Sequence, residues 1–210
     1  MSLFSPLAYL LAYDPTTNPL NNNEWSFPLL EILHILGFAL SIGTIAVVDL
    51  RLLGWGMKQS TPSQLLKATA PWSLAGLVVM LTTGPAIFSS DPRMYLFNQG
   101  FRFKMFVLLA AIVYNYTTRR WAALSGASGG AATLIGGWVL LAFGVLAWFS
   151  DWSFAGGLAM TIAGLLSFLF WLAFRGRKEE SWESGAALIG GVSLALWVSV
   201  VAGGIFIAFV

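Results

Sequence analysis

The sequence contains no cysteine and a single histidine, and only 10% of its 210 residues are charged. Without cysteine, the chain cannot form a disulfide, a thiolate metal site or an iron–sulfur cluster of its own. A bound metal must therefore use histidine, methionine, carboxylate or backbone ligands. Basic and acidic side chains nearly balance, at 11 and 9, so the charge indicates no nucleic-acid partner.

Motifs of hydrolytic and nucleotide-driven enzymes are also missing. The chain has no nucleophile elbow, glycine-rich phosphate loop, HExxH motif or carboxylate dyad at a useful spacing. The first 26 residues contain no lysine or arginine, so the basic start of a secretory signal is absent. We expect residues 1–26, with the short apolar stretch Pro6–Tyr13, to form a retained exterior segment at the membrane interface.

What the chain has instead is apolar sequence, because 58% of its residues are hydrophobic. A helix needs about 20 mostly apolar residues to cross the hydrocarbon core of a membrane. The alternating pattern of a β-barrel is absent. The sequence therefore predicts an all-α integral membrane bundle of six transmembrane helices, at 27–50, 68–89, 103–122, 130–149, 155–175 and 186–209.

The positions of the basic residues predict the orientation of this bundle. Eight of the eleven lie in the first, third and fifth connections, and the other three are Arg93, Arg102 and Lys104. Because cytoplasmic loops are enriched in lysine and arginine, we expect both termini on the periplasmic or exterior side of a bacterial cytoplasmic membrane. The similar runs 130–137 and 185–191 are rich in glycine and alanine, which we interpret as helix packing.

His34 lies inside the first apolar run and is the main candidate for a functional side chain. An ionisable residue within a membrane helix is costly and marks a functional site by default. At about 100° per residue, His34 shares a helix face with Glu31, Gly37 and Asp49. Gly37 leaves room for a flat macrocycle or for a neighbouring helix. The alternative for His34 is a hydrogen bond to the main chain of another helix, without any ligand.

Lys104 begins the third predicted helix on the exterior side, at a depth similar to that of Glu31 and His34. Its ammonium group is a candidate partner for a ligand at His34, although a lysine at a helix end also reaches the interface by snorkelling.

The opposite end of the bundle carries a second polar group. Asp49 and Arg51 end the first helix, and Asn115, Arg119 and Arg120 end the third. We predict a structural polar cluster that includes Asp49, Arg51 and Asn115. An ordinary ion pair at the helix ends is the favoured interpretation.

Two further features lie in the exterior half. Thr82-Thr83-Gly84-Pro85 places a proline inside the second helix, which predicts a kink or an end of the regular helix. Met80, Met94 and Met105 provide thioethers that suit Cu(I), although scattered methionines in membrane helices usually serve packing.

These residues resemble a known family. Segments Glu31–Thr44 and Asp49–Gly54, together with Thr83-Gly84, Asn98, Phe101, Phe103–Met105 and Asn115, resemble uncharacterised bacterial membrane proteins of the DUF6644 type over residues 25–122. More distantly, the chain is similar to copper-resistance protein D (CopD) and to HemJ-type protoporphyrinogen oxidases. That likeness implies that His34 is an axial haem ligand and that Lys104 is its functional companion. HemJ-like proteins are shorter, and this chain has no second histidine for the other axial position.

Three functions follow as expectations. The first is a haem b protein in electron transfer or in oxidation of a membrane-soluble substrate, with its site in a CopD-like half at 27–122. The second is copper transport or handling. The third is a non-catalytic subunit of a larger membrane complex, with the helices of 123–210 as a docking surface. Membrane lipids are partners in each case, and a homo-oligomer is compatible with all three.

Overall fold

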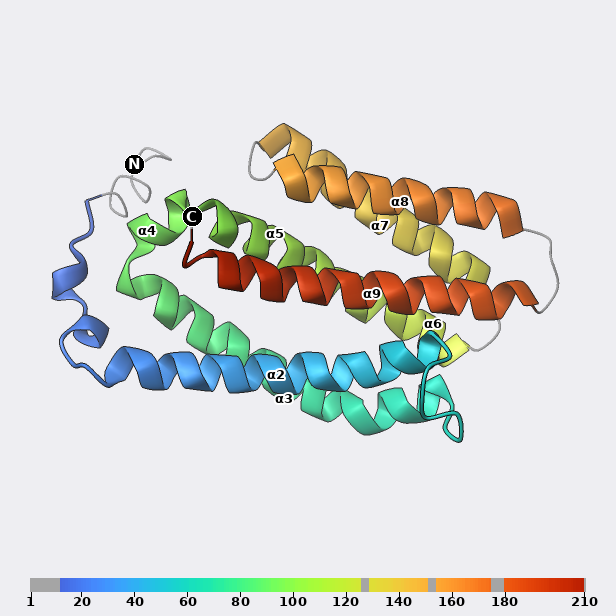
Figure 1. Ribbon diagram of the computed structural model, residues 1–210, viewed down its shortest axis with the longest axis horizontal. Helices are drawn as coiled ribbons and strands as arrows, with labels where there is room; N and C mark the ends of the chain where they lie inside the picture. The colour runs from blue at the N-terminus through green and yellow to red at the C-terminus, as the bar shows by residue number, and fades with distance from the viewer. Residues whose placement is uncertain (1–11, 126–128, 151–153, 175–179, 210) are drawn as a thin grey trace, which may run out of the picture.

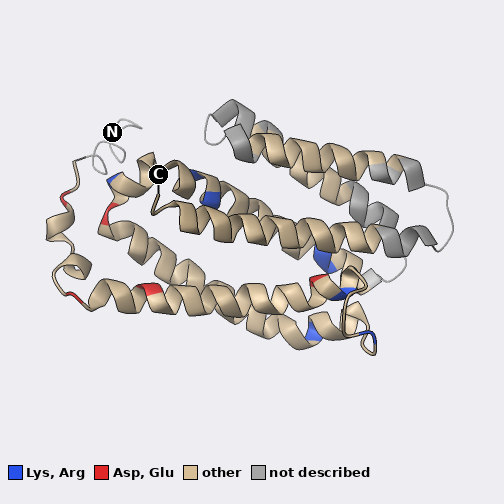
Figure 2. Cartoon of the chain, in the orientation of Figure 1, with Lys and Arg blue, Asp and Glu red and all other residues tan. Residues whose placement is uncertain are grey.

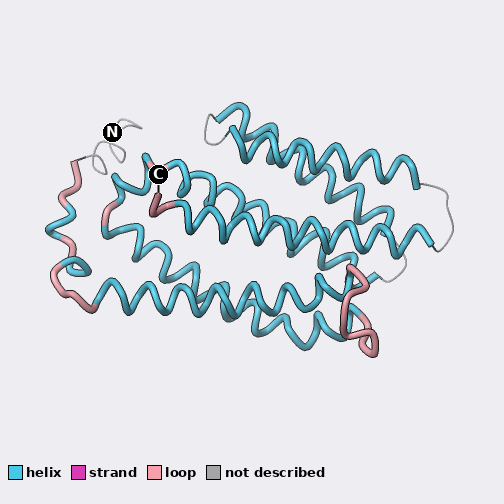
Figure 3. Tube along the Cα trace, in the orientation of Figure 1, coloured by secondary structure: helices cyan, strands magenta, loops and turns pink. Residues whose placement is uncertain are grey.

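The computed structural model describes residues 12–125, 129–150, 154–174 and 180–209 (Figure 1). Throughout these ranges the regular structure is helical and contains no strand (Figure 3), which confirms the predicted all-α class. The elements are η1 (Pro15–Thr17), η2 (Pro19–Asn21), α2 (Ser26–Leu52), α3 (Pro62–Ser90), α4 (Pro92–Phe97), α5 (Gln99–Tyr114), the π-helical turn η3 (Asn115–Arg119), α6 (Arg120–Ser125), α7 (Gly129–Ser150), α8 (Phe154–Phe174) and α9 (Glu180–Phe206).

The length and apolar character of the helices make the chain a membrane protein. The helices α2 and α3 and the segment Gly185–Phe206 of α9 are each long and apolar enough to cross a membrane. Large apolar side chains on the outside of the bundle, such as Leu36 and Val198 at 60% and 64% exposure, suit contact with lipid. Charged residues lie toward the two ends of the bundle (Figure 2). We call these the α4 end and the α6 end.

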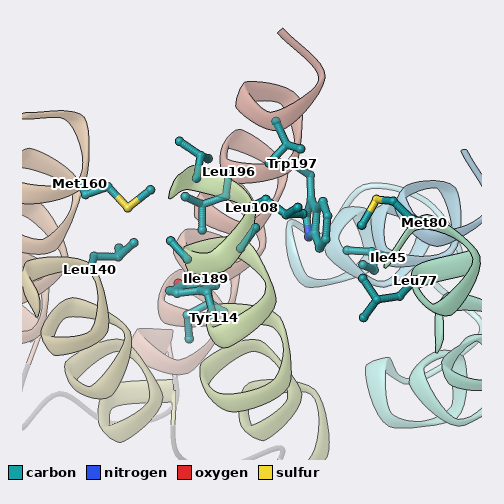
Figure 4. Close-up of a cluster of buried hydrophobic side chains, with 14 of the residues drawn as sticks. Ile45, Leu77, Met80, Leu108, Tyr114, Leu140, Met160, Ile189, Leu196 and Trp197 are labelled. Atoms are coloured by element: carbon teal, nitrogen blue, oxygen red, sulfur yellow. The ribbon is translucent and has the colours of Figure 1, made fainter. Parts of the chain in front are cut away.

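The helices pack mainly as antiparallel pairs. α2 lies along α3, α5 along α9, and α7 along α8, while α9 also contacts α2 and α7 (Figure 1). Apolar side chains from all three pairs form the core between them. Figure 4 shows Trp197 of α9 facing Ile45 and Met80, with Leu140 of α7 on the opposite side.

Glycines allow α2 to approach its two neighbours closely. A Cβ on Gly76 of α3 would lie 2.5 Å from the carbonyl oxygen of Gly37 and 2.6 Å from the amide nitrogen of Ser41. A Cβ on Gly190 of α9 would lie 2.7 Å from the carbonyl oxygen of Asp49. Backbones can therefore touch at both crossings, as small residues permit in membrane bundles. The run 185–191, which contains Gly190, thus serves helix packing.

The described part of the N-terminal segment covers the α4 end of α3. Asn18 Nδ2 donates a hydrogen bond of 2.6 Å to the carbonyl oxygen of Ser89, and Asn21 Nδ2 donates one of 2.9 Å to that of Ser90. These bonds satisfy carbonyl groups that the end of a helix leaves unpaired. The predicted interfacial stretch Pro6–Tyr13 lies outside the described residues except for its last two positions.

The regular helix does not end at Pro85. α3 continues through this proline to Ser90. It ends at Asp91, which has extended backbone angles of φ −152° and ψ 80° and precedes Pro92. A residue before proline is disfavoured in the helical region. At Pro85 the preceding residue is Gly84, whose missing side chain relieves the same clash.

Candidate functional site

The imidazole of His34 is half-buried and is held by the neighbouring helix. Its Nδ1 lies 2.8 Å from Thr83 Oγ1, and the Thr83 hydroxyl donates a hydrogen bond of 2.7 Å to the carbonyl oxygen of Val79. A hydroxyl has only one proton to donate. When that proton is donated to Val79, Thr83 Oγ1 accepts from a protonated Nδ1, and the main-chain carbonyl of Met80 also acts on the imidazole. In this tautomer Nε2 keeps a free lone pair.

Two glycines on either side of His34 have different roles. A Cβ on Gly84 would lie 3.4 Å from His34 Cε1, so this glycine lets the ring lie against α3. A Cβ on Gly37 would lie 2.8 Å from Val79 Cγ1. Of the two uses predicted for Gly37, the structure therefore shows the neighbouring helix, and the space beside Gly37 is filled by α3.

Lys104 lies across from His34 on α5. Its side chain packs along α9, where a Cβ on Gly204 would be 3.5 Å from Nζ. The ammonium group is close enough to His34 for its charge to act on the imidazole. Within the described part of the chain, Lys104 has no hydrogen-bond or ion-pair partner. The structure thus brings together the two residues that the sequence proposed as a pair.

Glu31 lies one helical turn before His34 and is exposed. Its charge acts on Tyr95 of α4, whose ring packs against Phe88 and Phe101 at centroid distances of 6.0 and 5.2 Å. Burial of the Tyr95 ring raises the pKa of its phenol. Glu31 therefore borders an aromatic cluster at the α4 end.

Asn98 fixes the start of α5, and with it the position of Lys104. Its Oδ1 accepts a hydrogen bond of 2.9 Å from the Phe101 amide, and its Nδ2 donates one of 2.9 Å to the carbonyl oxygen of Ile207. The first contact caps α5. The second ties that cap to the chain just after α9.

At the α6 end, Arg119 joins three other residues in a buried network. Its Nε donates to Asp49 Oδ1 in an ion pair, its Nη1 donates to Asn115 Oδ1 at 2.7 Å, and its Nη2 donates to the carbonyl oxygen of Ile45 at 2.8 Å. Asp49 and Arg119 are 0% and 2% exposed. The ion pair thus lies near the ends of α2 and η3 and is fully buried between helices.

Arg51 lies outside this network, so one member of the predicted cluster is placed wrongly. Its Nε donates a hydrogen bond of 2.8 Å to the carbonyl oxygen of Ser60 in the connection between α2 and α3. Two positions separate Arg51 from Asp49 along the chain, which places the two side chains on different faces of a helix.

A π-helical turn positions the network. In η3 the amide of Arg120 donates to the carbonyl oxygen of Asn115, five residues earlier. This turn brings Asn115 and Arg119 to the same buried side of the chain. Such turns are rare and occur frequently at functional sites. Sequence reasoning missed η3, because a run of ordinary polar residues carries no signal for a π-turn.

A small cavity adjoins the network. It has a volume of about 20 Å³, enough for about one water molecule. Its lining includes Thr44 of α2, Ser73 of α3, and Asn115, Arg119 and Arg120. Neither His34 nor Lys104 lines this cavity.

The methionines considered for copper differ in burial. Met80 is 2% exposed, and its thioether packs with Leu77 and Trp197 in the core (Figure 4). Met94 and Met105 are exposed. Across the described ranges, there is no group of three or more histidine, cysteine or acidic side chains that could hold a metal ion.

Comparison with known proteins places the chain in a family. Residues 28–161 match the model of a family of unknown function, DUF6644, and the match extends past residue 122 into α8. No curated protein and no solved structure matches the chain, so the likeness to CopD and HemJ-type proteins stays a prediction. The family match covers more than half of the sequence, and the chain therefore belongs to the DUF6644 family.

Proposed function

We propose that the chain is a haem b-binding membrane protein that acts in electron transfer or in oxidation of a membrane-soluble substrate. The orientation of His34 carries this proposal. Metal-binding histidines typically donate their second ring N–H to an oxygen acceptor, which fixes the ring and its tautomer. Thr83 plays this part for His34, because it accepts from Nδ1 at 2.8 Å and leaves Nε2 ready to bind iron.

The donor groups at the α4 end fit haem better than a bare metal ion. A single imidazole provides one ligand, which is sufficient for a five-coordinate haem iron. The unpaired ammonium of Lys104 suits a haem propionate. α2 and α5 carry these two groups, and apolar side chains of both helices pack into the same core, so haem between them requires these side chains to move apart. Haem bound there would supply one-electron chemistry.

The orientation in the membrane is part of the proposal. We infer six membrane spans, with α5, η3 and α6 together as the third and α7 and α8 as the fourth and fifth. Residues 12–21 and the end of α9 lie at the α4 end, while Arg119 and Arg120 lie at the other (Figure 1). The positive-inside tendency then directs the α6 end to the cytoplasm of a bacterial cell. The basic group Arg175, Arg177 and Lys178 lies outside the described residues.

The alternatives have less support. The distribution of Met80, Met94 and Met105 gives no reason to favour copper handling. A subunit role needs an outer surface for a partner. The exposed apolar side chains of α8, such as Leu166 and Leu169, are equally explained by lipid.

An absorption spectrum tests the proposal. Wild-type protein, expressed with haem available and purified in detergent, should show a Soret band with about one haem per chain. His34→Ala should lose the band and stay inserted in the membrane. Lys104→Gln should bind haem more weakly, since only the propionate contact is lost. Absence of a Soret band in the wild type, or an unchanged band in His34→Ala, would overturn the proposal.

A further inference from the structure

The interior of the described bundle contains buried polar side-chain atoms that lack hydrogen-bond partners. In the described part of the chain these are Ser41 Oγ, Asp49 Oδ2, Thr118 Oγ1, Ser193 Oγ and Trp197 Nε1. Native proteins pair nearly all such atoms, either directly or through an ordered water. Of these five atoms, Asp49 Oδ2 and Ser193 Oγ lie beside each other, which indicates water or another small polar species at this place.

Asp49 is the centre of this group. Its Oδ1 is bound by Arg119, whereas its Oδ2 has no hydrogen bond and is fully buried. The Ser193 hydroxyl of α9 lies beside the carboxylate without meeting hydrogen-bond geometry. A water between Oδ2 and Ser193 Oγ would satisfy both atoms. The ionisable groups that face Asp49 from neighbouring elements are Arg119 of η3 and Tyr114 of α5.

This arrangement differs from that of a purely structural ion pair. When an arginine only has to hold a carboxylate, two parallel hydrogen bonds to both oxygens give the strongest pair. Here Arg119 uses only Nε for Asp49 and directs Nη1 and Nη2 to Asn115 and Ile45. One carboxylate oxygen thus stays open while the charge of the other is compensated.

A route for water leads to the same place. The cavity of about 20 Å³ reaches Asn115 and Arg119 from the side of Arg120, which is exposed. One water in this cavity would contact the far side of the network that holds Asp49. Arg119 lines this cavity but Asp49 and Ser193 do not, so the cavity marks how far water reaches from the α6 end.

We propose that Asp49 is a proton-exchanging carboxylate inside the membrane, served by water that enters from the α6 end. A proton from the aqueous phase reaches Asp49 Oδ2 through the water at Ser193, and it leaves by the same route. Oδ1 keeps its contact with Arg119 in both states. This site goes beyond the proposed function and requires no cofactor at His34.

Infrared difference spectroscopy in lipid nanodiscs tests this proposal. Acidification should produce a carbonyl-stretching band of a protonated carboxyl that shifts in deuterated water and is absent in Asp49→Asn. If Asp49→Asn does not fold because Arg119 loses its partner, the charge-neutral double variant Asp49→Asn/Arg119→Gln takes its place. A difference spectrum that keeps every carboxyl band in these variants would overturn the proposal. So would a band of Asp49 that does not shift in deuterated water.

Two serines of α9 provide a matched comparison for the water route. Ser193→Ala should slow the deuterium shift of the Asp49 band severalfold, because it removes one partner of the bridging water. Ser199→Ala is the control, since the Ser199 hydroxyl donates a hydrogen bond of 2.8 Å to the carbonyl oxygen of Ala195 within the same helix. In Ser199→Ala the deuterium shift of the Asp49 band should occur at the wild-type rate. Equal rates in wild type and Ser193→Ala would contradict the route through Ser193.

Discussion

Nδ1 of His34 on α2 lies 2.8 Å from the hydroxyl oxygen of Thr83 on α3, and that hydroxyl is itself committed to the carbonyl oxygen of Val79. This relationship favours the tautomer of His34 in which Nδ1 carries the proton. It also makes the ring a fixed feature of the packed α2–α3 pair, with Nε2 as its remaining reactive atom.

Thr83→Val should weaken the site without emptying it. Valine has a similar volume but cannot accept from Nδ1, so a buried N–H is left without a partner at a cost of about 1–3 kcal/mol. We expect a lower thermal midpoint in detergent and weaker haem retention in a spectral titration.

Thr82→Val is the matched control for Thr83→Val. The Thr82 hydroxyl donates only to the carbonyl oxygens of Val78 and Val79, and it does not contact His34. Its removal should change haem retention little. Equal loss in the two variants would show that Thr83 has no special role in holding the imidazole.

Arg119→Ala should be among the most destabilising changes at a polar position. It leaves the Asp49 carboxylate buried without its counter-charge, which costs about 3–5 kcal/mol when one partner of a buried pair is removed. Arg120→Ala, at the exposed neighbouring position, should change stability by no more than about 0.5 kcal/mol. Thermal unfolding in detergent compares the two, and similar midpoints would contradict the buried network.

Gly76→Ala should push α2 away from α3, since its Cβ would lie 2.5 Å from a main-chain oxygen. Overpacking of this kind typically costs about 1–3 kcal/mol. Gly43→Ala is the matched control on α2, because a Cβ there meets nothing within 4 Å. That variant should be neutral or slightly more stable, as alanine favours a helix over glycine. The order of thermal midpoints checks this prediction.

The burial of Tyr95 predicts that the stability of the folded protein falls at alkaline pH. Burial raises the pKa of this phenol above its ordinary value of 10.0, so the folded protein binds the phenolic proton more tightly than the unfolded chain. This contribution to stability is full below pH 10 and is lost as the pH rises through the folded value. The contribution of Tyr95 to the ultraviolet tyrosinate signal is the part that is missing in Tyr95→Phe. This part should therefore titrate at a higher pH than the signal of exposed tyrosines. Titration at the ordinary value would contradict the burial of this ring.

Local sequence was sufficient to predict an all-α membrane protein and to place Lys104 at a depth similar to that of His34, close enough for its charge to act on the imidazole. Apolar runs identify membrane helices directly, and two helices that run in the same direction place their first turns at the same depth. The exact ends of the helices are harder to predict from the sequence. Pro71 and Pro85 are tolerated inside α3, and the helix ends at Asp91 before Pro92.

Contacts between distant segments were harder to foresee. Thr83 lies 49 residues from His34 and Arg119 lies 70 from Asp49, so no local pattern reveals either bond. The predicted inner cluster contained the right carboxylate and amide but gave Arg51 a place that belongs to Arg119. Gly37 was open to two uses, and only the packed structure shows that α3 fills the space beside it.

Rescue of a His34→Gly variant by imidazole tests the central claim most directly. If His34 Nε2 ligates haem iron, the variant should lack the Soret band that the wild type shows, and free imidazole should restore it by entering the vacated space. If the wild type has no Soret band, or if the variant binds haem equally well without imidazole, His34 is not a haem ligand.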